Sequence, residues 1–127
     1  MEISNMVTEY LTKFNIDVSS VGFEYLQKAI EICYENEDML SKVTASLYPM
    51  IGDFFGVKGS MVERTIRCVI EKSFKLGGML EINEVLNCVL YNNEYKFSNG
   101  EFISIIVKLM KFDILKEKMM EKYNIEI

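Results

Sequence analysis

Apolar residues recur along this chain at the three- and four-residue spacing that places side chains on one face of a helix. The N-terminal stretch shows the pattern in Ile3, Val7, Tyr10, Leu11 and Phe14. After a polar turn at residues 15–20, the next stripe consists of Phe23, Leu26, Ile30 and Cys33 or Tyr34. Polar residues at 35–38 end that stripe, and a third begins with Met39, Val43 and Leu47. The pattern predicts helices along nearly the whole chain.

The middle of the chain reads as two helices joined by a glycine-containing turn. Pro49 is tolerated in a first helical turn, so it opens a short helix that runs through Phe55. A turn at residues 56–59 follows. Ser60 then starts a longer helix, because Glu63 three residues on completes a capping-box pattern. Since the glycines at 77–78 stop this helix, the stretch predicts a helix-turn-helix.

The C-terminal third predicts a shorter helix over residues 81–90, a polar loop over 91–99 and a final helix. Ser98 or Asn99 can cap that helix, and Asp113 either continues it or begins another. Beyond it lie the apolar residues Ile114, Leu115, Met119 and Tyr123. These could cover the domain's own core or a partner's, including a second copy in a homodimer.

The helix expected from Ser60 has two distinct faces. At about 100° per residue, a core-facing stripe collects Val62, Ile66, Val69, Ile70 and Ser73. The opposite, solvent side carries Arg64, Arg67 and Glu71. Met61 and Cys68 lie on one flank and Glu63 on the other.

Charge makes this helix stand out from the rest of the chain. The 127 residues carry a net charge of −5, yet residues 58–75 hold five basic and two acidic side chains, a net +3. The chain's only arginines, Arg64 and Arg67, lie in this stretch. The second helix of a helix-turn-helix enters the DNA major groove, where arginine can bind guanine with two hydrogen bonds. The same face could instead be a solvated surface with an internal ion pair.

Composition limits the other classes of function. With no histidine, the chain lacks the commonest general base and metal ligand. The three cysteines form no C-x-x-C pair, and no apolar run reaches the roughly 18 residues of a membrane span. We therefore expect one domain that is not an enzyme, has no cofactor or metal, and acts in the cytoplasm, away from the membrane.

Four blocks of sequence resemble the C-terminal DNA-binding domain of stage-zero sporulation protein A, a response regulator. The blocks are VGFEYLQKAI from Val21, LYPMIGDFFGV from Leu47, SMVERTIRCVIE from Ser60 and SNGEFI from Ser98. The similarity extends from about Ile3 to Phe112, so the resemblance predicts a domain at 1–112 and a helical extension at 113–127. It implies an all-α bundle of about six helices.

The resemblance also implies a function and a site. The helix over about 60–76 would be the recognition helix, with Glu63, Arg64 and Arg67 at the base-reading positions. The placement of charge indicates Lys58, Lys72 and Lys75 as phosphate contacts, and the resemblance adds Ser60 and Met61 as flanking positions at the start of the helix. The expected partners are double-stranded DNA, to which copies of the protein would bind in tandem, and RNA polymerase. Both partners fit a transcription regulator that is associated with the nucleoid.

The chain departs from the family's pattern in three respects. Met61 replaces an arginine and Val21 replaces a lysine, so two positive charges are lost. The family's phosphorylatable receiver domain is not part of this sequence, so we expect either an excised domain with a long tail or a stand-alone homologue. The tail DILKEKMMEKYNIEI favours the homologue, which aspartyl phosphorylation would not control. These departures leave a second hypothesis open. The protein could be an interaction module that binds DNA weakly and modulates the full-length regulator or RNA polymerase.

Overall fold

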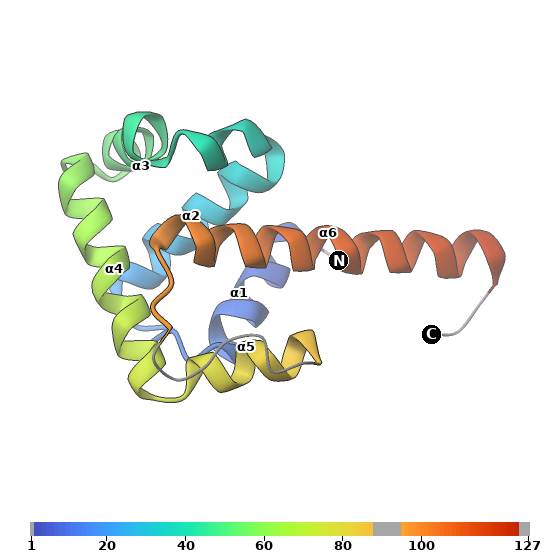
Figure 1. Ribbon diagram of the computed structural model, residues 1–127. Helices are drawn as coiled ribbons and strands as arrows, with labels where there is room; N and C mark the ends of the chain where they lie inside the picture. Colours follow the sequence, from blue (N-terminus) through green and yellow to red (C-terminus); the bar gives the residue numbers. More distant parts are fainter. Residues whose placement is uncertain (1, 88–94, 125–127) are drawn as a thin grey trace.

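The computed structural model describes residues 2–87 and 95–124, which fold into six α-helices without a strand in the described part (Figure 1). The helices are α1 (Ile3–Lys13), α2 (Val21–Glu35), α3 (Tyr48–Phe55), α4 (Gly59–Lys75), α5 (Gly78–Leu86) and α6 (Asn99–Tyr123). A 3₁₀ turn, η1 (Glu37–Ser41), and a π turn, η2 (Val43–Leu47), connect α2 to α3. The expected all-α fold is confirmed. Among these helices, none is long and apolar enough to cross a membrane.

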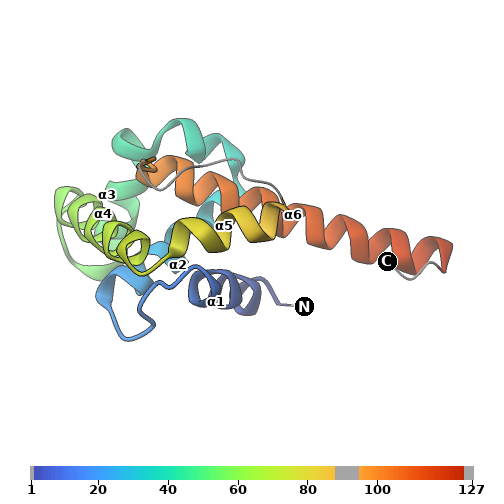
Figure 2. The ribbon, with the colours of Figure 1, turned by 60° about the horizontal axis from the view of Figure 1, so that its bottom comes forward.

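Helix α2 lies at the centre of the bundle and packs against α1, α4 and α6 (Figures 1 and 2). Several helices contribute fully buried side chains to the core, including Leu11, Leu26, Ile51, Ile66 and Phe102. Each such burial contributes about 1.5–3 kcal/mol. The α2–α4 contact is close, because a Cβ atom added at Gly22 would lie 2.8 Å from the Cβ of Val69. Helix α4 is thereby held directly on the core.

The segment between α2 and α3 is less regular than the stripe of Met39, Val43 and Leu47 predicts. The side chain of Asn36 accepts a hydrogen bond from the Asp38 amide and starts a separate 3₁₀ turn. Lys42 then leaves the helical region with φ −129°, and the π turn begins after it. The stretch that was expected to form a single helix is therefore divided at Lys42, between the two turns.

The C-terminal helices differ from expectation mainly at their ends. Gly77, with φ +93°, ends α4 as predicted, but α5 begins at Gly78 rather than at Glu81. Helix α5 ends at Leu86, and residues 88–94, which include the rest of the expected helix and much of the expected loop, lie outside the described residues.

Helix α6 is continuous across Asp113, so this residue extends the helix instead of starting another. The Tyr10 hydroxyl of α1 donates a hydrogen bond to the Asp113 carboxylate and ties the middle of α6 to the bundle. Of the four apolar residues beyond it, Ile114 packs against the core. Leu115, Met119 and Tyr123 are exposed. Residues 125–127 of the expected extension lie outside the described part of the chain.

Candidate nucleic-acid interface

Helices α3 and α4 form a tight helix-turn-helix. Gly56 takes the left-handed conformation, with φ +74°, and the Val57 amide donates a 2.9 Å hydrogen bond to the Gly52 carbonyl. A Cβ atom at Gly52 would lie only 2.4 Å from the Val57 carbonyl oxygen. One added at Gly59 would approach the Pro49 nitrogen to 3.1 Å. Glycine is therefore required where the two helices meet, and it sets the angle of α4.

The expected capping box at the start of α4 is wrong. The helix begins at Gly59 with Lys58 as its N-cap, and no side-chain cap is formed there. The Lys58 carbonyl accepts hydrogen bonds from the backbone amides of Met61 and Val62, so Ser60 is already within the first turn. The N-cap of α4 is therefore two residues before the Ser60 of the expected capping box. Within the described chain a capping box occurs instead at α6, between Ser98 and Glu101.

The two faces of α4 match the sequence prediction. Its buried residues are Val62, Ile66, Val69, Ile70 and Ser73, the same five that the periodicity places inward. The exposed residues include Ser60, Met61, Arg64, Arg67, Cys68, Glu71, Lys72 and Lys75. The structure thus gathers the candidate contact residues on the solvent side of one helix, preceded by exposed Lys58.

The two arginines have different surroundings. Arg67 Nη1 forms an ion pair with Oε1 of Glu63, one helical turn earlier. Their side chains remain 49% and 35% exposed, so the pair lies at the surface. Arg64 is exposed, and none of the described residues pairs with it. Arg64 can therefore meet a ligand directly, whereas Arg67 is oriented by Glu63.

Lysines at the end of α4 extend the basic surface toward the start of α2. Hydrogen bonds from Ser19 lower the pKa of the Asp17 carboxyl, and the positive charge of Lys72 adds a smaller lowering effect. The loop before α2 lies near the end of α4, where the Asn15 side-chain amide donates a hydrogen bond to the Leu76 carbonyl. Lys72 and Lys75 also lie in the last turn, where positive charge is favourable to the helix dipole.

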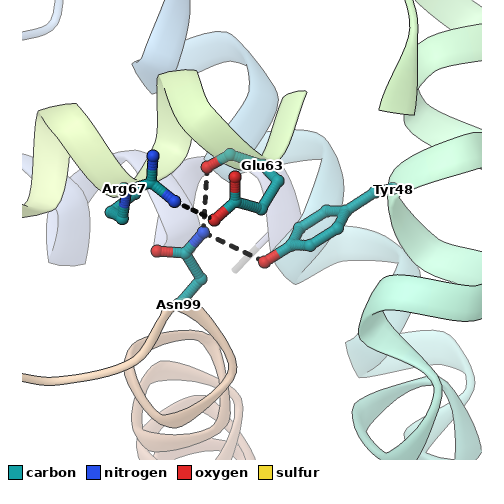
Figure 3. Close-up of polar contacts among 4 residues, drawn as sticks. All are labelled: Tyr48, Glu63, Arg67 and Asn99. Atoms are coloured by element: carbon teal, nitrogen blue, oxygen red, sulfur yellow. Dashed lines mark hydrogen bonds and ion pairs between the residues drawn. The ribbon is translucent and has the colours of Figure 1, made fainter. Parts of the chain in front are cut away.

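Behind this exposed face, a buried amide joins three helices (Figure 3). The side-chain nitrogen of Asn99 donates hydrogen bonds to the Tyr48 hydroxyl oxygen at 3.0 Å and to the Glu63 backbone carbonyl at 3.1 Å. Asn99 and Tyr48 are only 7% and 5% exposed. Burial raises the pKa of Tyr48, and the hydrogen bond from Asn99 partly offsets that effect. The first residue of α6 therefore fixes α4 against α3.

Sequence reasoning did not find this contact. Asn99 stood out only as an alternative cap for α6, but Ser98 provides the cap, and the Asn99 side chain points to α3 and α4. Tyr48 precedes the proline that marks α3, with no separate signal. The sequence signal was a second polar residue, Asn99, beside the cap Ser98. That signal was too weak to identify the partners of Asn99.

Elsewhere in the described part of the chain, the cysteine and acidic side chains are the types of group that can bind a metal ion. No group of three or more Cys, Asp or Glu side chains able to hold a metal is found within residues 2–87 and 95–124. The thiol of Cys33 is buried, which raises its pKa to about 11 and keeps it protonated at neutral pH. Cys68 is exposed on α4, and Cys88 lies outside the described residues.

Comparison with protein families gives one match that includes this interface. The model of the family described as sporulation initiation factor Spo0A C terminal matches residues 7–110. The match covers α2 to α5, most of α1 and the first half of α6, and it therefore contains the whole helix-turn-helix. The distal half of α6 lies beyond it.

Proposed function

This chain belongs to the Spo0A C-terminal family, whose members are DNA-binding effector domains of sporulation regulators, and we propose that it binds a specific DNA sequence through α4 to regulate transcription. The observation that carries the proposal is the exposed arginine face of α4, held on the core by Gly22, Gly52 and Asn99. A rigid helix with outward arginines fits the major groove, where side chains at the start of the helix reach base edges.

Within the proposal, the three base-reading residues have separate roles. Arg64, unpaired within the described structure, donates two hydrogen bonds to a guanine. Arg67 reads a second base while Glu63 keeps its guanidinium in one orientation, an arrangement supported by their ion pair. Met61, which is 50% exposed at the start of α4, contacts a thymine methyl group where an arginine would make a polar contact.

Lysines and the helix start supply contacts to the DNA backbone. Lys58 precedes the first turn of α4 and Ser60 lies within it, and Lys72 and Lys75 lie in the last turn. We propose that these residues contact DNA phosphates, because such contacts position a domain on DNA without reading the base sequence. Their positive charge is local, since the chain as a whole carries −5.

The wider setting follows from the same proposal. A regulator of this kind acts on the nucleoid in the cytoplasm. Binding of copies to neighbouring DNA boxes and contact with RNA polymerase are further parts of the proposal, supported by the family likeness alone.

The salt dependence of binding tests the proposal against the alternative of an interaction module with weak DNA affinity. The intact chain is used to select a duplex from a random pool, and its affinity for that duplex and for a scrambled one is measured between about 50 and 200 mM salt. We expect preference for the selected duplex and a log–log salt slope of about −0.9 for each phosphate neutralised. Failure to enrich any sequence, together with a slope near zero, would favour the interaction module.

A further inference from the structure

The distal half of α6 projects beyond the rest of the bundle in both ribbon views (Figures 1 and 2). Four large apolar side chains on it are exposed: Phe112 57%, Leu115 54%, Met119 43% and Tyr123 57%. We refer to these four residues as the α6 seam. All four lie beyond residue 110, where the family match ends, so the matched domain does not include them.

The seam is straight and narrow. Its residues follow one another at intervals of three, four and four, which places them within about 80° around the helix axis. A stripe this narrow is typical of the seam of a helix pair, whereas a helix lying in a membrane surface carries a wider apolar face. The shape of the seam therefore favours another helix as its occupant.

Positive charge borders the seam on both sides. Lys116 and Lys122 lie over the Phe112 and Tyr123 rings, with Nζ 5.5 Å and 5.3 Å from the ring centroids. Helical spacing places Lys118 beside Lys122 on the same border. The acidic residues of this segment, Asp113, Glu117 and Glu121, fall on the other side of the helix. The rim of the seam is thus basic.

From these observations we propose that the α6 seam docks an amphipathic helix of another protein, whose own apolar stripe is bordered by acidic residues. Apolar contact along the seam and charge pairing along its rim would act together, as in helix pairs selected by their flanking charges.

A second copy of this chain is a poor occupant by the same argument. Antiparallel pairing of two seams would set Lys118 and Lys122 of one copy against the same border of the other. Parallel pairing would set them beside Lys116. Like charges face each other in both arrangements, which disfavours association.

The seam and α4 lie at different ends of the molecule (Figure 1). A partner on α6 would therefore leave the exposed face of α4 free. The inference goes beyond the proposed DNA binding and can be tested separately from it.

A designed peptide pair tests the inference on the intact chain. Both peptides are amphipathic helices of about three heptads with leucine seams, one bordered by glutamate and the other by lysine. We expect the glutamate peptide to bind in a fluorescence anisotropy titration. The variant Leu115→Glu/Met119→Glu should weaken that binding at least about tenfold, since it places charge at the centre of the contact. Leu80→Glu changes a leucine of α5 that is 60% exposed and serves as the matched control.

If the double glutamate variant unfolds the distal half of α6, a charge-reversal variant still tests the proposal. Lys118→Glu/Lys122→Glu keeps the apolar seam and should exchange the preference from the glutamate peptide to the lysine peptide. Equal binding of both peptides, or a preference unchanged by charge reversal, would overturn the proposal. So would self-association in sedimentation, or binding to vesicles rich in anionic lipid, if either disappears in the seam variant. DNA binding should be unaltered in all seam variants, so a loss there reports on α4 instead.

Discussion

Asn99, the first residue of α6, donates a 3.1 Å hydrogen bond to the backbone carbonyl of Glu63 in α4. The two residues are 36 positions apart in the chain. Helix α6 carries no candidate DNA contact. This bond nevertheless connects α6 to the backbone of α4 directly before Arg64 and one turn before Arg67. The orientation of the proposed reading helix thus depends on a buried residue outside that helix.

Removing the Asn99 amide should reduce stability and weaken sequence preference together. Asn99→Ala deletes two hydrogen bonds and leaves the buried Tyr48 hydroxyl without this partner, at a cost of about 1–3 kcal/mol in the free energy of unfolding. Tyr48→Phe removes one of the two bonds and should cost less. Denaturant unfolding of both variants measures the difference, and an equal or larger loss in Tyr48→Phe would contradict the assigned role.

The two arginines should contribute to specificity without contributing much to stability. Arg64→Ala and Arg67→Ala should each lose about 1–3 kcal/mol of discrimination between selected and scrambled DNA. That is roughly 5- to 150-fold in the affinity ratio. Lys13→Ala, an exposed change on α1, is the control for loss of one charge. A double arginine variant that retains full preference would rule out α4 as the reading helix.

Neutralising Glu63 should separate affinity from specificity. Glu63→Gln keeps the size of the side chain but removes the ion pair with Arg67 and one negative charge from the proposed DNA-binding surface. The pair is exposed, so stability should change by less than about 1 kcal/mol. We expect tighter binding to scrambled DNA and a smaller preference for the selected duplex. An unchanged ratio of the two affinities would show that Glu63 does not orient Arg67 on DNA.

The turn of the helix-turn-helix should not accept a methyl group. In Gly52→Ala the added carbon meets the Val57 carbonyl at 2.4 Å, and backbone on both sides must move, at a cost of about 1–3 kcal/mol or more. The matched control is Gly100→Ala, whose added carbon finds Val43 at an ordinary 3.7 Å inside the first turn of α6. That variant should be neutral or slightly stabilised. Thermal unfolding of the pair provides the comparison.

Two cysteines should differ in reactivity, and one should make stability depend on pH. In a Cys88→Ser background, a thiol reagent at pH 8 should modify exposed Cys68 quickly and buried Cys33 only on unfolding. Burial raises the Cys33 pKa from 9.0 to about 11, so the folded state holds its proton more tightly than the unfolded state. This contribution to stability should be present at neutral pH and fall as pH rises from about 9 to 11. Equal modification rates for the two thiols would contradict the burial of Cys33.

Local sequence patterns were enough to predict much of the helical structure of this protein. Periodicity identified the inward stripe of α4 residue by residue, because a helix face is set by spacing alone. Proline and glycine marked α3 and the end of α4, because their backbone preferences act within a few residues. The resemblance in four short blocks led to the family that the model match shows.

Helix ends and the joints between helices depended on contacts that no short window contains. Helix α4 starts at Gly59, where the backbone of Pro49 lies close, and the path after α2 is divided at Lys42. The Asn99 contact required α3, α4 and α6 to converge first. The sequence alone determined which residues of α4 face the core and that its arginines face outward, since both follow from helical geometry. Only the tertiary structure decided how α4 is held, that Glu63 engages Arg67 but not Arg64, and that the end of α6 stays uncovered, because each depends on distances between side chains in the folded chain.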